Sequence, residues 1–155
     1  MRMNSPKTRL VTGDKGFVGS LCMKAWPSAI GLSELAGASI DICDKVALRH
    51  ALANTELNEV IHLAGISFVP DAVADPLRTY QVNFLGTLNL LECLRDVGFL
   101  GRFIYVSSGD AYGLVQTSQL PVKETVPLAP RNPYAVSKAA AEALCYQWSQ
   151  TSGFE

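Results

Sequence analysis

Short apolar runs rich in β-branched residues alternate along the chain with longer amphipathic stretches. This alternation is typical of βαβ units built around a buried parallel sheet. The apolar runs predict strands at residues 9–12, 29–32, 38–42, 59–64 and 102–106. The amphipathic stretches predict helices at residues 17–26, 45–54, 79–97 and 134–151. We therefore expect an α/β fold with a doubly wound parallel sheet of the Rossmann type.

Composition narrows the possible functions. The 155 residues are 48% hydrophobic, which is enough to bury a core, and the net charge of -1 comes without a cluster of Lys and Arg. We therefore expect neither a nucleic-acid nor a membrane partner. No apolar run approaches the roughly 18 residues of a membrane span, and residues 1–8 lack the apolar core of a signal peptide, so the cytoplasm is the expected location.

The cysteines do not have the spacing of a metal site. Cys22, Cys43, Cys93 and Cys145 lie far apart and form no CxxC or CxxH pair. We therefore expect these side chains to pack among apolar neighbours, and we expect no zinc site and no redox pair.

A glycine-rich turn follows the first predicted strand. Residues 12–19 read TGDKGFVG, a GxxGxxG spacing. Gly13 would allow a tight turn, Gly16 would let the backbone approach a pyrophosphate, and Gly19 would let the next helix sit close to the sheet. A flexible loop is the alternative. Because the motif lies between a predicted strand and a predicted helix, whose N-terminal N–H groups attract phosphate, it predicts dinucleotide binding.

The residues after the second predicted strand leave the form of the cofactor open. Ser33 and Glu34 stand where a carboxylate would accept a hydrogen bond from the free 2′-hydroxyl of the ribose in NAD. Lys15, within the glycine turn, could instead pair with the 2′-phosphate of NADP. Glu34 could equally be a solvated surface charge. The sequence therefore predicts NAD or NADP without choosing between them.

A phenol and an ammonium are paired late in the chain. Tyr134 and Lys138 stand four residues apart at the start of a predicted helix, so they share one face. A nearby ammonium favours the tyrosinate, which lets the tyrosine exchange a proton with a carbonyl or an alcohol. Such a pair alone is more often an ordinary helix surface. Here the strand at residues 102–106 also delivers the hydroxyls of Ser107 and Ser108 to the sheet edge where open α/β folds bind ligands.

Five motifs together resemble one family. They are TGDKGFVG, VIHLAG, YQVNFLGTLNLLE, VSSGDAYG and PRNPYAVSKAAAE, and they cover essentially the whole chain. They resemble the extended short-chain dehydrogenases/reductases, the NAD-dependent epimerase/dehydratase group that acts on nucleotide sugars. In that family the catalytic hydroxyl stands five positions before the glycine of the YG pair. This implies Ser108, Tyr134 and Lys138 as the catalytic set, with a nucleotide-sugar substrate.

The resemblance also implies binding roles. Residues expected to contact the cofactor are Gly13, Gly16, Phe17, Val18, Gly19, Asp41, Ile42, Leu63, Ala64, Gly65, Asn83, Tyr134 and Lys138. Residues expected to contact the substrate are Ser67, Ser108, Gly109, Asp110 and Tyr134. Simpler interpretations stay open for three residues. Asp41 could start a helix, His62 could be a core histidine, and Asn83 could cap a backbone kink. The family is also homodimeric, through the helices that carry Asn83 and Tyr134.

Within the family the motifs are most similar to the branch of GDP-4-dehydro-6-deoxy-D-mannose reductases, which make GDP-D-rhamnose for bacterial surface polysaccharides. A 4,6-dehydratase is disfavoured, because Gly109 offers no side chain and Asp110 is shorter than the usual glutamate. A nucleotide-sugar 4-epimerase is an alternative with the same catalytic set. A dinucleotide-binding module without enzymatic activity is the alternative of a different class.

The predicted strands end early. A doubly wound dinucleotide fold has six or more strands, and the family continues with a further strand and a smaller substrate domain. We therefore expect residues 1–155 to be an incomplete NAD(P)-binding Rossmann domain without the substrate domain. An open sheet edge and an uncovered apolar face would then make the isolated chain poorly stable or inactive. Measurable ketone reduction by this chain would contradict that expectation.

Overall fold

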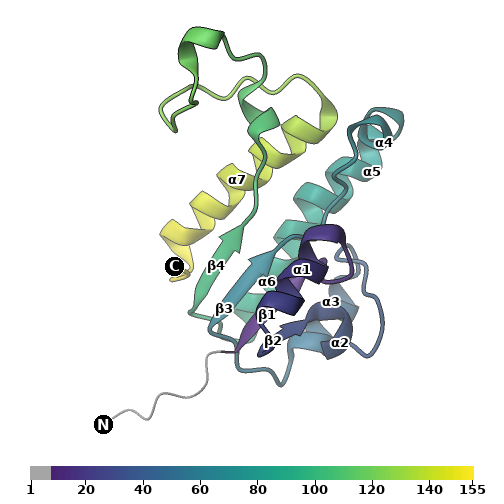
Figure 1. Cartoon of the computed structure of the whole chain (residues 1–155). Coiled ribbons are helices and arrows are strands. Elements are labelled where there is room, and N and C mark those ends of the chain that lie inside the picture. Colours follow the sequence, from purple (N-terminus) through teal and green to yellow (C-terminus); the bar gives the residue numbers. More distant parts are fainter. Residues whose placement is uncertain (1–7) are drawn as a thin grey trace.

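Four parallel β-strands form the centre of the molecule in a computed structural model that describes residues 8–155 (Figure 1). The strands are β1 (Arg9–Thr12), β2 (Ala29–Gly31), β3 (Glu59–His62) and β4 (Arg102–Tyr105). Their order is β2-β1-β3-β4, and Leu10 is in register with Ile30 on one side and Val60 on the other. The Rossmann-type α/β fold predicted from the pattern is confirmed. Except for Thr8, the N-terminal stretch without a signal-peptide core lies outside the described residues.

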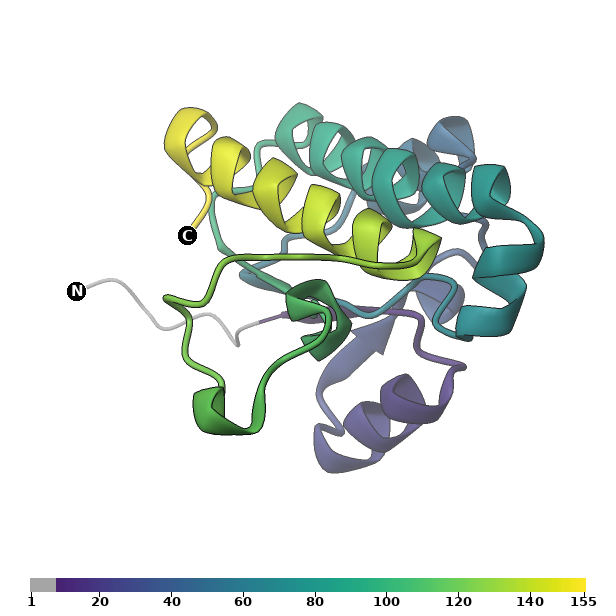
Figure 2. The ribbon, with the colours of Figure 1, turned by 90° about the horizontal axis from the view of Figure 1, so that it is seen from above.

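Helices cover both faces of this sheet. The α-helices are α1 (Phe17–Ala25), α2 (Leu32–Leu35), α3 (Lys45–Leu52), α4 (Val69–Ala74), α5 (Pro76–Tyr80), α6 (Thr87–Asp96) and α7 (Pro133–Thr151). A π-helical segment, η1 (Gln81–Gly86), joins α5 to α6, and two 3₁₀ turns, η2 (Gly109–Tyr112) and η3 (Thr117–Gln119), follow β4. Figure 2 shows α6 and α7 side by side on one face of the sheet, with α1 on the opposite face.

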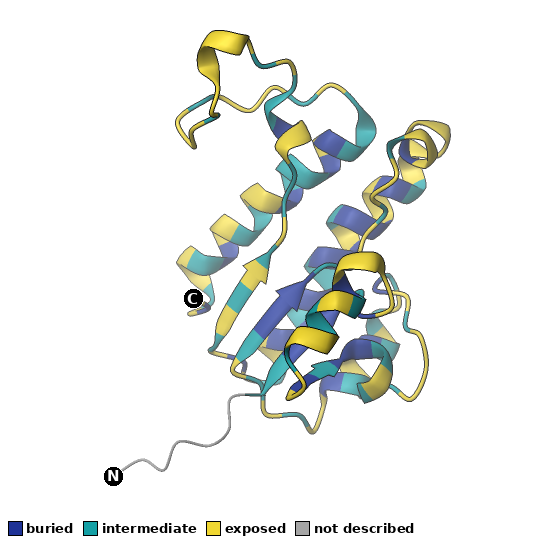
Figure 3. Ribbon diagram, in the orientation of Figure 1, coloured by how far each residue is buried: buried dark blue, intermediate teal, exposed yellow. Residues whose placement is uncertain are grey.

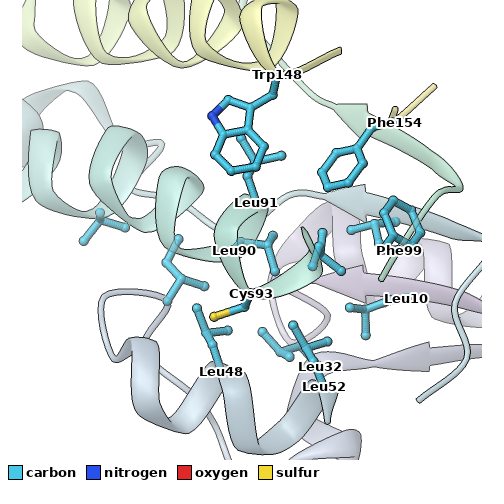
Figure 4. Packing of buried hydrophobic residues seen from close by; sticks show 14 residues of the cluster. Leu10, Leu32, Leu48, Leu52, Leu90, Leu91, Cys93, Phe99, Trp148 and Phe154 are labelled. Atoms are coloured by element: carbon cyan, nitrogen blue, oxygen red, sulfur yellow. The ribbon is translucent and has the colours of Figure 1, made fainter. Parts of the chain in front are cut away.

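The main core lies under the paired helices. Leu48 of α3, Leu90 of α6 and Trp148 of α7 belong to one buried cluster that also contains Leu10 and Val60 of the sheet. Figure 4 shows this cluster between the helices and the strands. The apolar spacing that predicted these helices therefore marks faces that are largely buried, although Val46 and Leu85 are exposed. None of the helices in residues 8–155 combines the length and the apolar character needed to cross a membrane.

Two predictions about local structure were wrong. Residues 38–42 were expected to be a strand, but they run as irregular chain. The Asp41 carboxylate accepts the N–H of Cys43 (2.9 Å), which turns the backbone toward α3 instead of extending it beside β2. The apolar pattern predicted neither a helix nor a strand around Pro70 and Pro76, but this stretch forms α4 and α5. Both prolines stand in the first turn of a helix, where no backbone N–H is needed.

The edge of the sheet at β4 carries no further strand among the described residues. β4 pairs with β3 only, and its residues alternate between exposed and intermediate burial (Figure 3). The last residues of the chain return to this edge. Phe103 N–H donates to the carbonyl of Glu155 (2.9 Å), and Glu155 N–H donates to the carbonyl of Gly101 (3.1 Å). Glu155 therefore pairs through its backbone with the outer edge of β4.

His62, the last residue of β3, is 1% exposed and is held between two threonines. Thr12 Oγ1 lies 2.7 Å from Nδ1 of the ring, and Thr87 Oγ1 lies 2.9 Å from Nε2. The Thr12 oxygen accepts the N–H groups of Leu63 and Ala64 (3.1 Å each), so its own proton is directed to Nδ1. The network therefore holds a neutral imidazole that donates from Nε2, and His62 is the core histidine that was one interpretation of the sequence.

This burial predicts a pH dependence of stability. Desolvation, with a smaller contribution from the charge of Lys138, lowers the pKa of His62 to about 3, so below pH 6.5 the unfolded chain binds a proton that the folded chain does not. Stability is then lost as the pH falls from 6.5 toward 3, by about 2 kcal/mol between pH 7 and pH 5. Urea unfolding at the two pH values should show this loss in the native chain and in His50→Gln, whose histidine is exposed. His62→Gln should largely lack it, and an equal loss in that variant would contradict the assignment.

Candidate active site

The site lies where the four parallel strands end. All carboxyl ends of a parallel sheet meet at one edge, and open α/β folds bind their ligands there. Thr12, at the end of β1, fixes this edge, because its hydroxyl accepts the N–H groups of Leu63 and Ala64, which follow β3. The glycine turn and the segment after β3 are therefore held against each other.

The geometry of the glycine turn leaves no room for a side chain at Gly13 or Gly19. Gly13 has a φ of +68°, and a Cβ there would lie 2.8 Å from the backbone N of Ala64. A Cβ on Gly19 would lie 2.1 Å from the carbonyl oxygen of Gly13. Helix α1 begins after Gly16 with no side-chain cap and no acidic residue in its first turn. Its first N–H groups are therefore available to an anion.

A cavity of about 390 Å³ lies between this turn, the end of β3 and α7. Most of the residues that the sequence predicted for the cofactor line it. The lining residues are Gly13, Gly16, Phe17, Val18, Gly19, Leu63, Ala64, Gly65, Ser67, Val106, Ser107, Tyr134 and Lys138. The tertiary structure thus brings together the glycine turn and the tyrosine–lysine pair, which are more than a hundred residues apart in the sequence.

The start of α7 is fixed by its sequence. Asn132 Oδ1 accepts the N–H of Ala135 (2.7 Å), and Pro133 occupies the first helical position. Tyr134 therefore stands in the first turn and Lys138 one turn later, and both line the cavity. The Lys138 ammonium lies 4.4 Å from the centroid of the Tyr105 ring. Burial lowers the pKa of Lys138 to about 8, which makes this ammonium a stronger acid than a solvated lysine.

Asn83 braces the site from outside the cavity. Its side chain is buried in η1, where Oδ1 accepts the N–H of Ile66 (2.7 Å) and Nδ2 donates to the carbonyl of Ile66 (2.9 Å). Nδ2 also donates to Ser137 Oγ (2.9 Å), which in turn donates to the carbonyl of Tyr134 (2.7 Å). The direct contact of Asn83 with the cofactor stays a prediction, and its hydrogen bonds in this structure are with the protein. The amide connects the segment after β3 to the helix that carries Tyr134.

The two serines after β4 differ in their hydrogen bonds. Ser107 lines the central cavity and also the neighbouring cavity that Ser108 lines, and its hydroxyl donates to Glu142 Oε2 (2.7 Å) on α7. Ser108 lines this neighbouring cavity, of about 470 Å³, together with Gly109, and its oxygen accepts the N–H of Asp110 (3.2 Å). The Ser107 proton is thus committed to a carboxylate, whereas the Ser108 proton is free to be donated. No motif in the sequence pointed to Glu142, although it stands one turn after Lys138 on the same face of the helix.

Asp41 and Ile42 line a third cavity, of about 310 Å³, next to Ala64 and Gly65. The Cys43 N–H and the Arg78 guanidinium (2.6 Å) lower the pKa of the Asp41 carboxyl. Arg78 also lines this cavity, and no motif in the sequence pointed to it. Asp41 therefore starts no helix. The cap of α3 is Asp44, whose carboxylate accepts the N–H groups of Val46 and Ala47.

The carboxylate at the end of β2 comes from an unexpected residue. Glu34 is exposed on α2, whereas Asp14 of the glycine turn is 7% exposed and accepts the N–H of Ser33 (3.2 Å). Asp14, Lys15 and Ser33 line a fourth cavity, of about 110 Å³, beside Gly13. In the sequence, Glu34 and Lys15 gave opposite indications about NAD and NADP. The structure adds a third residue, Asp14, at this place. No spacing rule would have placed Asp14 there.

These surroundings fit a dinucleotide. The glycine cradle that a Cβ would fill, the open N-terminus of α1 and the cavities along the sheet edge provide places for a pyrophosphate and for the groups on either side of it. Tyr134 and Lys138 line one of these cavities, and Asp41 and Arg78 line another.

Comparison with known sequences gives matches that span part of longer proteins. The GDP-6-deoxy-D-mannose reductase of Pseudomonas aeruginosa is 59% identical over 95 residues, which are 61% of this chain and 31% of that protein. The UDP-glucose 4-epimerase 2 of Oryza sativa is 38% identical over 165 residues, which cover 90% of this chain and 40% of that protein.

Solved structures match nearly the whole of this chain. RMD from Pseudomonas aeruginosa, complexed with NADPH, has a TM-score of 0.88 and 43% identity over 96% of this chain and 50% of that one. UDP-glucose 4-epimerase from Thermus thermophilus, in complex with NAD, has a TM-score of 0.84 and 31% identity over 96% of this chain and 52% of that one. This chain thus spans about half the length of these solved relatives.

The family model described as GDP-mannose 4,6 dehydratase matches residues 32–155, which include β3, β4 and the whole of α7. The solved relatives share the fold over 96% of this chain. The chain belongs to the NAD-dependent epimerase/dehydratase family of the extended short-chain dehydrogenases/reductases.

Proposed function

We propose that the protein reduces the 4-keto group of a nucleotide sugar with NADH or NADPH, converting GDP-4-dehydro-6-deoxy-D-mannose to GDP-D-rhamnose for a surface polysaccharide. One observation supports the reduction of a ketone. Tyr134 and Lys138 line the same cavity as the glycine turn, so a bound nicotinamide and a proton donor would share it. The substrate is supported by the 59% identity to a GDP-6-deoxy-D-mannose reductase over 95 residues.

In this mechanism the protein positions and protonates the ketone. When bound, the reduced nicotinamide supplies the hydride for carbon 4 of the sugar. The Tyr134 hydroxyl donates its proton to the ketone oxygen, and the Ser108 hydroxyl donates a hydrogen bond to the same oxygen. The Lys138 ammonium stabilises the tyrosinate that remains until a proton is returned from solvent. The first N–H groups of α1 bind the pyrophosphate.

Reduction is favoured over dehydration by the residues after Ser108. A 4,6-dehydratase needs acid and base groups beside the catalytic serine, but Gly109 has no side chain and Asp110 lines neither of the two cavities that Ser107 and Ser108 line. The backbone N–H of Asp110 donates to the Ser108 oxygen. A 4-epimerase would use the same residues and would retain its cofactor through a cycle.

The homodimer implied by the family stays a prediction. Leu85 of η1 and Val136 of α7 are exposed, at 47% and 39%, on the two segments expected to pair with their copies. Exposed apolar side chains at these places are compatible with such an interface.

Replacement of the proposed proton donor tests the mechanism. Tyr134→Phe removes the hydroxyl alone, so we expect the rate of GDP-4-dehydro-6-deoxy-D-mannose reduction by the natural protein to fall by about 10²-fold to 10⁴-fold. The Kd for reduced cofactor should stay within about threefold, because binding energy lost only in the transition state leaves the ground state unchanged. Tyr146→Phe, on the exposed side of α7, is the matched control.

Unchanged reduction by Tyr134→Phe would refute the mechanism. Absence of reduction by the unaltered protein, together with NAD that co-purifies and conversion of one nucleotide sugar to its 4-epimer, would assign the epimerase function instead.

The two serines can be separated in the same assay. Because the Ser108 proton is free and the Ser107 proton is donated to Glu142, we expect Ser108→Ala to lower kcat by about a hundredfold or more. Ser107→Ala should lower kcat severalfold at most. The reverse order of the two effects would show that Ser107 holds the ketone.

A further inference from the structure

Asp14 is an unusual residue at the edge of the cofactor site, because its carboxylate is turned away from the pyrophosphate turn and toward β2. A Cβ on Gly31, the last residue of β2, would lie 2.5 Å from Asp14 Oδ2, so only glycine leaves room for it. Asp14 Oδ1 accepts the backbone N–H of Ser33 (3.2 Å), and Oδ2 accepts the Ser33 hydroxyl. The carboxylate is thus fixed at the end of the second strand.

The end of the second strand is where dinucleotide folds distinguish the two nicotinamide cofactors. A carboxylate there accepts a hydrogen bond from a free ribose 2′-hydroxyl, and cationic or hydroxyl donors there accommodate a 2′-phosphate. Ser33 offers two such donors, its N–H and its hydroxyl. In this chain both donors are already engaged by Asp14. A phosphate at this position would therefore meet an anion in place of two donors.

The charges around Asp14 also favour a free ribose 2′-hydroxyl over a 2′-phosphate. Its side chain is 7% exposed, so solvent screens its negative charge weakly. Lys15 is the cation of the glycine turn, but its side chain is 79% exposed and its ammonium lies 3.9 Å from Asp14 Oδ2. An exposed and partly compensated ammonium attracts a phosphate less than the buried carboxylate repels it. A carboxylate has about four acceptor sites, so Asp14 retains capacity for a ribose hydroxyl beside the two Ser33 bonds.

We propose that Asp14 determines cofactor specificity by occupying the donors of Ser33, so that the site accepts a dinucleotide with a free 2′-hydroxyl and rejects one with a 2′-phosphate. This inference rests on the proposed function and narrows its cofactor to NAD. It assigns the selection to Asp14 of the glycine turn, whereas the sequence left Glu34 and Lys15 as opposing candidates.

The test compares two ligands that lack the nicotinamide, so that its outcome does not depend on catalysis. Isothermal titration of the chain with ADP-ribose and with ADP-ribose 2′-phosphate should give a Kd at least about tenfold lower for the unphosphorylated ligand. In Asp14→Asn, which removes the charge and keeps the size, the two Kd values should come within about threefold of each other. Glu34→Gln removes a carboxylate from the exposed surface of α2 and should keep the native ratio.

The unaltered chain alone can overturn the proposal, whether or not the variants fold. Equal or tighter binding of the 2′-phosphate ligand would refute the role of Asp14 and leave a cofactor site in place. Loss of the preference in Glu34→Gln, with the preference retained in Asp14→Asn, would assign the selection to Glu34 and would also refute it. Failure of the folded chain to bind either ligand would refute the cofactor site itself, and with it the proposed function.

Discussion

One hydroxyl joins the carboxyl ends of the two central strands. Thr12 Oγ1 accepts two backbone N–H groups of the segment after β3 and hydrogen-bonds to the His62 ring. The Gly13 turn leaves β1 one residue later, so the distance between this turn and the Ala64 backbone is set by the same bonds. The cavity that contains Tyr134 and Lys138 is bounded by these two segments. A side chain without partners at this position would leave two buried N–H groups unpaired, at a cost of about 1–3 kcal/mol each.

The site is braced by side chains that do not line it. Asn83 connects Ile66 to Ser137, and Ser137 connects to the backbone of Tyr134, so the segment after β3 and the start of α7 are held together by one buried amide. Within residues 8–155 no deeply buried side-chain nitrogen or oxygen lacks a hydrogen-bond partner. The residues with spare hydrogen-bonding capacity are instead those at the cavities, such as Ser108 with its free proton. This division is expected of a preorganised site, where a satisfied scaffold holds a few unsatisfied groups in place.

Lys138 has a different environment from a surface lysine. Its ammonium faces the ring of Tyr105, and burial lowers its pKa to about 8. Burial also raises the pKa of Cys145, on the same helix, to about 12, so this thiol stays protonated and adds no negative charge. The ammonium is therefore available to the tyrosine and to a ligand.

The sequence by itself determined the features that depend on neighbouring residues. Apolar periodicity located the four strands and α7, the glycine spacing located the turn, and the four-residue separation put Tyr134 and Lys138 on one helical face. Each follows from backbone geometry within about one turn or one strand. The sequence did not exclude a strand at residues 38–42, because a strand exists only when a neighbour pairs with it. It also did not locate α4 and α5, since prolines start helices as well as interrupt them.

Only the tertiary structure decided which distant side chains meet. Asn83 and Ser137 are 54 residues apart, and Ser107 and Glu142 are 35 residues apart. Asp14 reached the end of β2 because the sheet places that end beside the glycine turn, and Gly31 leaves space for the carboxylate. Such contacts depend on the packing of whole elements, so no local spacing encodes them. The candidate residues of the site were therefore readable from the sequence, whereas the hydrogen bonds that brace it and the place of Asp14 at the end of β2 were set by the folded sheet.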